Sequence, residues 1–233
     1  MRRTAGRIGL LLLVLALIPA VVAVALWPLT PSVADAEQRV ATRLAAHGAT
    51  DPHAVARPNR VGTAIIATED SRFYAHHGLD ALGVVRAAAG FARGSSDPGG
   101  ATLDQQLSKN LYTSNSVLAK VKQVELSFKL EAQYSKPEIL EMYLSEVYFG
   151  EGHYGLPAAA RGYFGVAPAS LTWGQASVLA GLVQAPSAYD PLHHLALAKK
   201  RQRHVLDRLV AVGALSRAGA DAAYAEPLQL LRG

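Results

Sequence analysis

The sequence predicts a mainly α-helical domain behind a single N-terminal transmembrane helix. Three observations favour this class: a long apolar run opens the chain, apolar residues then recur at helical spacing, and strand-like alternation is scarce. Half of the 233 residues are hydrophobic, which is ample for a core and excludes a disordered chain. Cysteine is absent, which excludes disulfide frameworks, thiolate metal sites and cysteine nucleophiles.

The apolar run, residues 8–29, is long enough to cross a bilayer. Its 22 residues span a hydrocarbon core of roughly 30 Å at about 1.5 Å per residue. Three arginines precede the run, which places the N-terminus in the cytoplasm and the remainder of the chain outside it. A cleaved signal peptide is the alternative, with small residues at 33–36 as its cleavage site, although signal cores are usually about 7–15 residues long. We favour a retained anchor over residues 1–29.

The charge balance argues against a nucleic-acid partner. The formal net charge is +5, but three of the 23 basic residues and none of the acidic residues lie before residue 30, which leaves 20 basic and 18 acidic residues. A nucleic-acid footprint needs a concentrated basic face. The local exception is the cluster Lys199, Lys200, Arg201 and Arg203, and on a helix such a cluster is typically a solvated face or lies near anionic lipid headgroups.

Polar and apolar segments divide the rest of the chain. Residues 30–58 are polar, are punctuated by prolines, and are predicted to form a stalk with a short helix near 36–47. Beyond them, apolar residues at helical spacing predict a domain over residues 59–212. The tail over 213–233 is left unassigned.

Four helices of this domain are predicted from apolar residues at helical spacing. The marking positions are Val117, Val121, Val124 and Phe128; Leu140, Tyr143, Leu144 and Val147; Val178, Leu179, Leu182 and Val183; and Val205, Leu206, Leu209 and Val210. Capping boxes predict two of the helix starts, Ser135 with Glu138 and Thr172 with Gln175. Glycine-rich loops are expected near 94–100 and 150–155.

The segment ATEDSRFYAHHG, residues 67–78, is the first candidate for catalysis. An apolar stretch leads directly into the adjacent carboxylates Glu69 and Asp70. A carboxylate that emerges from an apolar segment loses solvation, which suits it to act as a general base. The alternative is a helix end with a solvated Glu-Asp pair, which is the commoner situation for such a segment alone.

The segment GGATLDQQLSKN, residues 99–110, is the second candidate. Its two glycines let the backbone approach a ligand closely, and polar side chains including Lys109 then crowd a helix start. A helix N-terminus with a lysine nearby suits a phosphate or pyrophosphate. A plain glycine loop before a polar helix start is the commoner alternative. Nucleotide hydrolysis is not indicated, because the pattern G-x-x-x-x-G-K-[ST] is absent.

Five segments in order resemble the peptidoglycan glycosyltransferase family, which is the transglycosylase module of class A penicillin-binding proteins and of monofunctional glycosyltransferases. They read AIIATEDSRFYAHHGLD, GGATLDQQLSKNLY, YSKPEILEMYLSEVYFGEGHYG, AAARGYFG and LAGLVQAPSAYDP, and span about residues 60–209. The resemblance implies a lysozyme-like helical glycosyltransferase domain on the outer face of a bacterial cell membrane. A transpeptidase domain is not expected, because Ser-x-x-Lys and Lys-Thr-Gly motifs do not occur together.

The resemblance also implies a reaction, the polymerisation of lipid II into a β-1,4-linked glycan strand. Glu69 is implied to take a proton from the acceptor sugar hydroxyl, which attacks the lipid-linked sugar with inversion. Undecaprenyl pyrophosphate leaves as an anion, which calls for cations such as Lys109. The other implied substrate-binding residues are Gly100, Thr102, Gln105, Gln106, Asn110, Asp70, His76 and Lys120. The sequence requires no cofactor, while the resemblance allows Mg²⁺ or Mn²⁺. Membrane lipid and other cell-wall synthases are the further partners it allows.

Several positions depart from the family pattern. Ala101 stands where the family usually has serine, and Asp104 where it usually has threonine. The family motif Arg-Lys-x-x-Glu falls on AKVKQ, so Lys120 is kept while Gln123 replaces a second carboxylate. Glu125 lies about 200° around a helix from Gln123 and is not expected to stand in for it. These changes predict reduced activity.

Two functions from different classes therefore follow. We favour an active lipid II polymerase that uses Glu69 and Lys109. The second is a catalytically impaired homologue that binds lipid II or a partner synthase as a scaffold. A lytic transglycosylase is a further enzyme alternative, but cleavage of finished glycan would not call for the region around Lys109.

Overall fold

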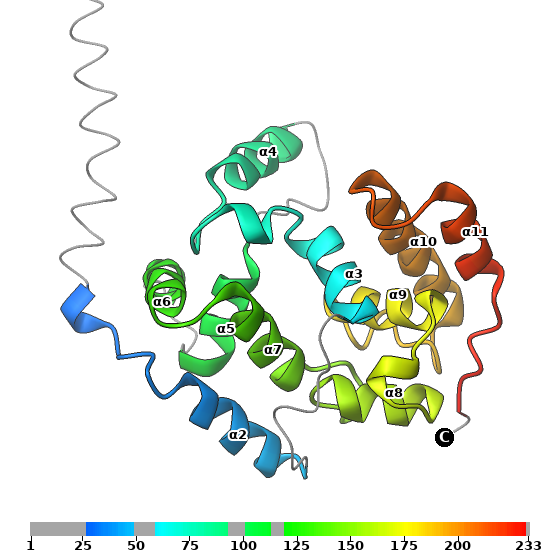
Figure 1. Cartoon of the computed structure of the whole chain (residues 1–233), viewed down its shortest axis with the longest axis horizontal. Coiled ribbons are helices and arrows are strands. Elements are labelled where there is room, and N and C mark those ends of the chain that lie inside the picture. Colours follow the sequence, from blue (N-terminus) through cyan, green and yellow to red (C-terminus); the bar gives the residue numbers. More distant parts are fainter. Residues whose placement is uncertain (1–26, 49–58, 93–100, 113–118, 232–233) are drawn as a thin grey trace, which may run out of the picture.

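The computed structural model describes residues 27–48, 59–92, 101–112 and 119–231, and it confirms the mainly α-helical class (Figure 1). The helices are α2 (Ala36–Ala46), α3 (Arg60–Glu69), α4 (Ala81–Ala92), α5 (Leu103–Tyr112), α6 (Ala119–Gln133), α7 (Lys136–Glu146), α8 (Leu156–Phe164), α9 (Trp173–Leu182), α10 (Leu195–Ala211) and α11 (Arg217–Ala225), with short 3-10 turns at Trp27–Leu29, Phe73–Ala75 and Pro168–Ser170. Within the described ranges there is no strand. An isolated antiparallel β-bridge joins Tyr148 to Tyr154 across the predicted glycine-rich loop.

The predicted membrane anchor falls almost wholly outside the described residues, which begin at Trp27. Among the helices that are described, none is both long enough and apolar enough to cross a membrane. The predicted loop near 94–100 and the candidate residue Gly100 also lie outside the described part of the chain. The anchor therefore stays a prediction.

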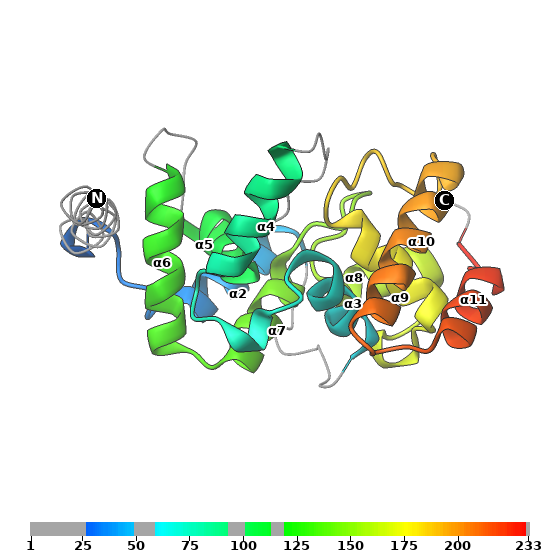
Figure 2. The same cartoon turned by 90° about the horizontal axis from the view of Figure 1, so that it is seen from above.

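The helices form two groups that meet along α3 and α7 (Figure 2). On one side α5 packs against α6 and α7, and on the other side α3 packs against α9 and α10. The end of α3 thereby comes to the start of α5, which brings the two candidate segments of the sequence together.

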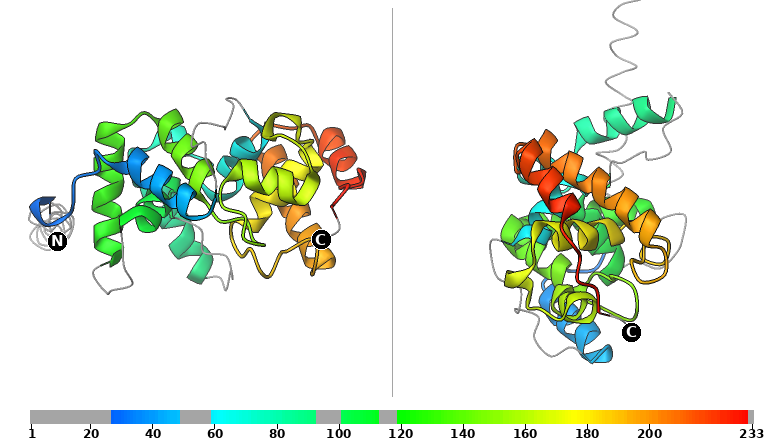
Figure 3. Two further views of the ribbon diagram at one scale, coloured as in Figure 1. Left: turned by 90° about the horizontal axis from the view of Figure 1, so that it is seen from below. Right: turned by 90° about the vertical axis from the view of Figure 1, so that its right-hand side faces the viewer.

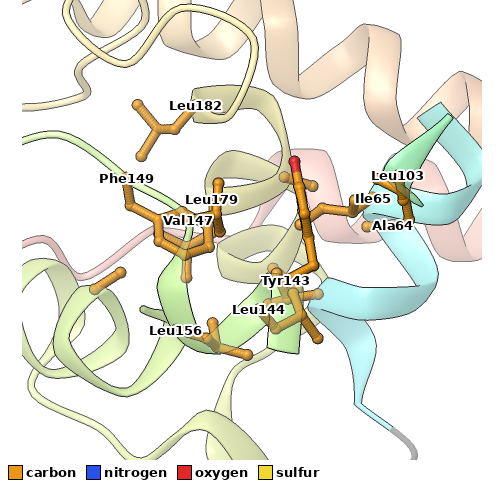
Figure 4. Packing of buried hydrophobic residues seen from close by; sticks show 14 of the residues in the cluster. Ala64, Ile65, Leu103, Tyr143, Leu144, Val147, Phe149, Leu156, Leu179 and Leu182 are labelled. Atoms are coloured by element: carbon orange, nitrogen blue, oxygen red, sulfur yellow. The ribbon is translucent and has the colours of Figure 1, made fainter. Parts of the chain in front are cut away.

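A continuous hydrophobic core runs through both groups. Tyr143 of α7 lies fully buried at its centre, between Ile65 and Leu103 on one side and Val147 and Phe149 on the other (Figure 4). Because these residues come from α3, α5, α7 and the loop after α7, the core fixes α3 and α5 relative to one another.

The predicted helix starts and most of the predicted buried faces are confirmed. Glu138 accepts a hydrogen bond from the backbone of Ser135 at 2.7 Å, and Thr172 and Gln175 exchange two hydrogen bonds at 3.1 and 3.2 Å. The apolar faces of α7, α9 and α10 point into the core as the helical spacing predicts. Local signals alone therefore define these three helices.

Helix α6 forms as predicted, but the apolar residues that marked it in the sequence are not the residues that it buries. Val121 is 38% exposed and Val124 and Phe128 are half-buried, while Val117 lies outside the described residues. The residues that α6 buries are Ala119, Gln123, Glu125, Leu126, Ser127 and Leu130. Half of these residues are polar, and the Ser127 hydroxyl, for example, donates to the backbone carbonyls of Val124 and Gly78, so apolar spacing alone does not reveal this face.

Both ends of the described chain pack into the core beyond the predicted limits of 59–212. Helix α2 lies within the predicted stalk, crosses beneath α5 and α7, and buries Leu44 (Figure 3). Helix α11 lies within the unassigned tail, packs against α9 and α10, and is followed by the buried Leu228. The folded unit therefore includes α2 and α11.

Candidate active site

Glu69 is the last residue of α3, and its carboxylate contacts a buried arginine from α10. Arg201 Nη2 donates a hydrogen bond to Glu69 Oε1 at 2.9 Å, and the two side chains are 7% and 18% exposed. Charge-assisted pairs of this kind favour the ionised carboxylate, which is the form that accepts a proton. The site thus contains a carboxylate suited to general-base work.

Arg201 has room in the core because a glycine lies beside it. A Cβ atom built on Gly181 of α9 would lie 2.8 Å from Arg201 Cγ. Arg208, about two turns further along the same side of α10, donates from Nε to the backbone carbonyl of Ala67 at 3.1 Å. Two arginines of α10 therefore hold the last turn of α3.

The expectation of a solvated basic face at 199–203 was wrong for Arg201. Lys199 and Arg203 lie over the ring of Tyr224 at 3.9 and 3.8 Å, and Lys200 is exposed. The missed signal was helical spacing, because Arg201 precedes the buried Val205 by four residues and shares its face.

Asp70 turns inward, so the alternative of a solvated Glu-Asp pair does not describe it. Its Oδ2 atom accepts a hydrogen bond from the backbone nitrogen of Leu103 at 3.0 Å and another from His76 Nε2 at 2.9 Å. Leu103 is the first residue of α5. Asp70 thereby fastens the end of α3, which carries Glu69, to the start of α5.

A buried charged cluster lies behind Asp70 and His76. Lys136 Nζ of α7 is 3.3 Å from Asp104 Oδ2 of α5 and 3.5 Å from His76 Nδ1, and it also contacts Glu131. Burial raises the pKa of Asp104 to about 7, with the opposing charge of Lys136 limiting the shift.

This cluster does not fit the Mg²⁺ or Mn²⁺ ion that the sequence resemblance allows. Ligand atoms of Asp70, His76 and Asp104 lie within 4.8 Å of one another. However, the ammonium group of Lys136 already lies between His76 and Asp104, and Asp70 already accepts hydrogen bonds from two donors. A divalent cation would need those oxygens and would face the lysine charge. These three residues are therefore committed to hydrogen bonds and ion pairs within the protein.

Two predicted substrate-binding residues of α5 are hydrogen-bonded to α7. Gln106 Oε1 accepts from the hydroxyl of Tyr143 at 2.9 Å, and one turn later Asn110 Nδ2 donates to Glu146 Oε1 at 2.7 Å. Burial raises the pKa of Tyr143 well above its usual value, with further contributions from the charges of Glu69 and Glu146. Tyr143 thus lies within electrostatic reach of both carboxylates.

Glu146 is a second buried carboxyl group at this site. Burial raises its pKa to about 7, and hydrogen bonding from Asn110 and the charge of Arg43 limit the shift. Arg43 Nε lies 3.4 Å from Glu146 Oε2 without the alignment of a hydrogen bond. Glu146 therefore depends mainly on Asn110 for its partner.

Thr102 and Gln105 are buried and support a loop. Their side chains donate to the carbonyl of Gly78 at 2.9 and 3.3 Å. Gly78 has φ +79°, and a Cβ atom there would lie 2.9 Å from the backbone of Ser127. These two predicted substrate-binding residues thus order the turn after His76.

The predicted cationic residues Lys109 and Lys120 are exposed on α5 and α6. Gln123, where the family pattern has a carboxylate, is 9% exposed. Its backbone carbonyl accepts a hydrogen bond from the Ser108 hydroxyl at 3.0 Å. Glu125 is 2% exposed, and its two carboxylate oxygens make no hydrogen bond. The site therefore combines the carboxylate of Glu69 with lysines at the surface.

The chain belongs to the transglycosylase family, whose sequence profile matches residues 39–210. This confirms the family resemblance of the five sequence segments. The match begins within α2, in agreement with the packing of that helix into the core.

Individual relatives differ in how much of their length this chain covers. Penicillin-binding protein 1A of Vibrio cholerae is 42% identical over 73% of this chain and 21% of that protein. A Cupriavidus necator protein described as a candidate transglycosylase is 39% identical over 74% of this chain and 76% of that protein. A crystal structure of penicillin-binding protein 1A from Haemophilus influenzae shares 38% identity over 42% of this chain and 14% of that one, with a TM-score of 0.40. The chain thus spans about a fifth of the length of the penicillin-binding proteins that it matches.

Proposed function

We propose that this chain is a peptidoglycan glycosyltransferase that polymerises lipid II into β-1,4-linked glycan strands. The observation that carries the proposal is the Glu69–Arg201 pair, because it gives a partly buried carboxylate in its proton-accepting form at the junction of α3 and α5. Membership of the transglycosylase family supports the same class of reaction. The products are the lengthened strand and undecaprenyl pyrophosphate.

The proposed chemistry uses one base and surface cations. Glu69 accepts the proton of the acceptor sugar hydroxyl as that oxygen bonds to C1 of the lipid-linked sugar, with inversion at C1. The bond from C1 to the pyrophosphate oxygen breaks, and the pyrophosphate leaves with the electron pair. Its charge is met by Lys109 and Lys120, which are exposed on neighbouring helices. Gln106 and Asn110 line the same stretch of α5 and orient the sugars.

The chain is proposed to act at the outer face of a bacterial cell membrane, with residues 1–29 as its anchor. Helix α4 supports this location, because Leu82, Val84 and Val85 on it are 54%, 46% and 64% exposed. The helix stands apart from the body of the fold (Figures 1 and 3). An exposed apolar surface of this kind is typical of a helix that contacts lipid.

A second candidate function is a scaffold that binds lipid II or a partner synthase with little catalysis. The observation that favours it is Gln123, because a neutral amide in place of a carboxylate removes a charged group from the site. If this loss limits an active enzyme, the Gln123→Glu variant should polymerise lipid II faster than wild type, and an unchanged rate would exclude that explanation.

One assay separates the two functions. Purified full-length protein is incubated with labelled lipid II, and glycan polymer and bound lipid II are measured for wild type and for Glu69→Gln. Glu37→Gln on the exposed side of α2 is the matched control. Polymer from wild type and from the control, but not from Glu69→Gln, supports the glycosyltransferase. Retained lipid II binding without polymer in all three supports the scaffold.

A further inference from the structure

Five charged or titratable side chains from separate parts of the chain meet in the cluster behind Asp70. They are Asp70 at the end of α3, His76 after the Phe73–Ala75 turn, Asp104 in α5, Glu131 in α6 and Lys136 in α7. None of these side chains is more than 13% exposed. The exposed His77 lies at the rim, 3.8 Å from Glu131. Groups buried this deeply are held in fixed hydrogen-bonding roles.

The position of Lys136 determines which nitrogen of His76 carries the hydrogen. A lysine ammonium group can only donate, and Lys136 Nζ lies 3.5 Å from His76 Nδ1. Nδ1 is therefore the acceptor, which leaves the ring hydrogen on Nε2. That nitrogen lies 3.0 and 2.9 Å from the two carboxylate oxygens of Asp70, to which it donates.

Asp104 and Glu131 together hold Lys136 beside His76. The two oxygens of Asp104 accept from Lys136 Nζ at 3.5 and 3.3 Å, and the ring of Phe73 lies 4.2 Å from the same ammonium group. Glu131 also contacts Lys136, but its Oε1 atom accepts from the backbone nitrogen of Gly78 at 3.2 Å, in the loop beyond His76. Without the charge of Asp104, the lysine would be held mainly by Glu131.

We propose that Asp104 is a positioning residue for glycosyl transfer. It holds Lys136 against His76, so that His76 donates from Nε2 to Asp70. The bonds of Asp70 then keep the end of α3, and with it Glu69, in place beside the start of α5. The inference rests on the proposed function of Glu69. It concerns a residue at which this chain departs from the threonine that the family pattern usually has. The chain of contacts is continuous from Asp104 through Lys136 and His76 to Asp70, which directly follows Glu69.

The first test reads the ring of His76 directly. The side-chain nitrogens of full-length protein are observed by ¹⁵N NMR at about pH 8, above the raised pKa of Asp104. Loss of signals in His76→Asn assigns the residue. Wild type should show hydrogen on Nε2 alone, and Asp104→Asn should show a mixture of the two neutral forms. Hydrogen on Nδ1 in wild type, or an unchanged ring in Asp104→Asn, would overturn the proposal.

The second test measures catalysis by the same proteins. For Asp104→Asn we expect a roughly ten-fold fall in kcat with KM unchanged, because small displacements of catalytic groups cost up to about 100-fold. Asp104→Thr gives a second replacement, thermal unfolding reports whether each variant folds, and Asp221→Asn at an exposed ion pair is the matched control. A changed His76 ring with unchanged kcat would overturn the positioning role. A wild type without polymer contradicts the proposed function instead, and the NMR result still decides the link from Asp104 to His76.

Discussion

Glu69 and Arg201 form an ion pair at 2.9 Å although they lie 132 positions apart in the sequence. Glu69 ends α3 and Arg201 lies in the middle of α10, and these helices pack directly against each other. The charge of the proposed base is therefore set by the tertiary fold rather than by its own segment. Several consequences of this arrangement can be measured.

Removal of the arginine charge should make Glu69 harder to ionise. For Arg201→Met, we expect kcat/KM for lipid II polymerisation to fall by roughly 100-fold, because Glu69 loses the guanidinium group that orients it. The acidic limb of the pH–rate profile should also move to higher pH, since the positive charge of Arg201 no longer stabilises the ionised carboxylate. Arg201→Lys, which keeps a positive charge without the planar guanidinium group, should have a kcat/KM between those of wild type and Arg201→Met. An acidic limb at the wild-type pH in Arg201→Met would contradict this role.

The space beside Arg201 should matter as much as its charge. In Gly181→Ala the new methyl group would lie 2.8 Å from Arg201 Cγ, so the arginine must move away from Glu69. We expect about a ten-fold loss of kcat and an unfolding free energy lowered by about 1–3 kcal/mol, as for other overpacked sites. Ala218→Ser, at an exposed position in the first turn of α11, is the control and should leave both quantities near wild type. Full activity in Gly181→Ala would show that Arg201 can shift without consequence.

The buried carboxyl group of Glu146 should make stability depend on pH. Its pKa is raised from 4.5 to about 7, so the folded state binds a proton that the unfolded state has lost between these values. The contribution is complete below about pH 4.5 and is lost as the pH rises through about 7. Glu146→Gln should weaken this decline by about 1–3 kcal/mol, measured as unfolding free energy at about pH 5 and about pH 8. If the unfolding free energy of the variant declines equally steeply with pH, the decline arises from other groups, such as Asp104.

The apolar residues of α4 should contribute to lipid binding. Val85→Asp places a charge at a side chain that is 64% exposed, and we expect several-fold weaker partitioning to liposomes of anionic bacterial lipid, measured by flotation with residues 1–29 removed. Leu197→Asp on α10, where the side chain is 48% exposed, is the matched control. Equal partitioning of the two variants would remove α4 as support for a membrane-facing surface.

Local signals in the sequence predicted the parts of the fold that local interactions determine. The capping boxes at Ser135 and Thr172 give the starts of α7 and α9 because their hydrogen bonds span three residues. The segment around Glu69 could also be recognised from the sequence alone, because its characteristic residues are consecutive.

Features that depend on distant contacts could not be found in this way. Arg201 reads as part of a basic cluster until α10 is packed on α3, and the buried face of α6 is obscured by its polar members. Asp104 reads as a simple substitution, and its place in a buried network emerges when Lys136 comes from another helix. Thr102 and Gln105 read as ligand-binding residues, yet their side chains are hydrogen-bonded to the carbonyl of Gly78.

If Glu69 is the base of a lipid II polymerase, the initial rate of glycan polymer formation must fall in Glu69→Gln. The amide keeps the size of the side chain but cannot accept the proton, so we predict a fall of roughly 100-fold to 10,000-fold, with lipid II binding retained. Glu37→Gln should polymerise at the wild-type rate. A rate for Glu69→Gln within a few-fold of an active wild type would contradict the account.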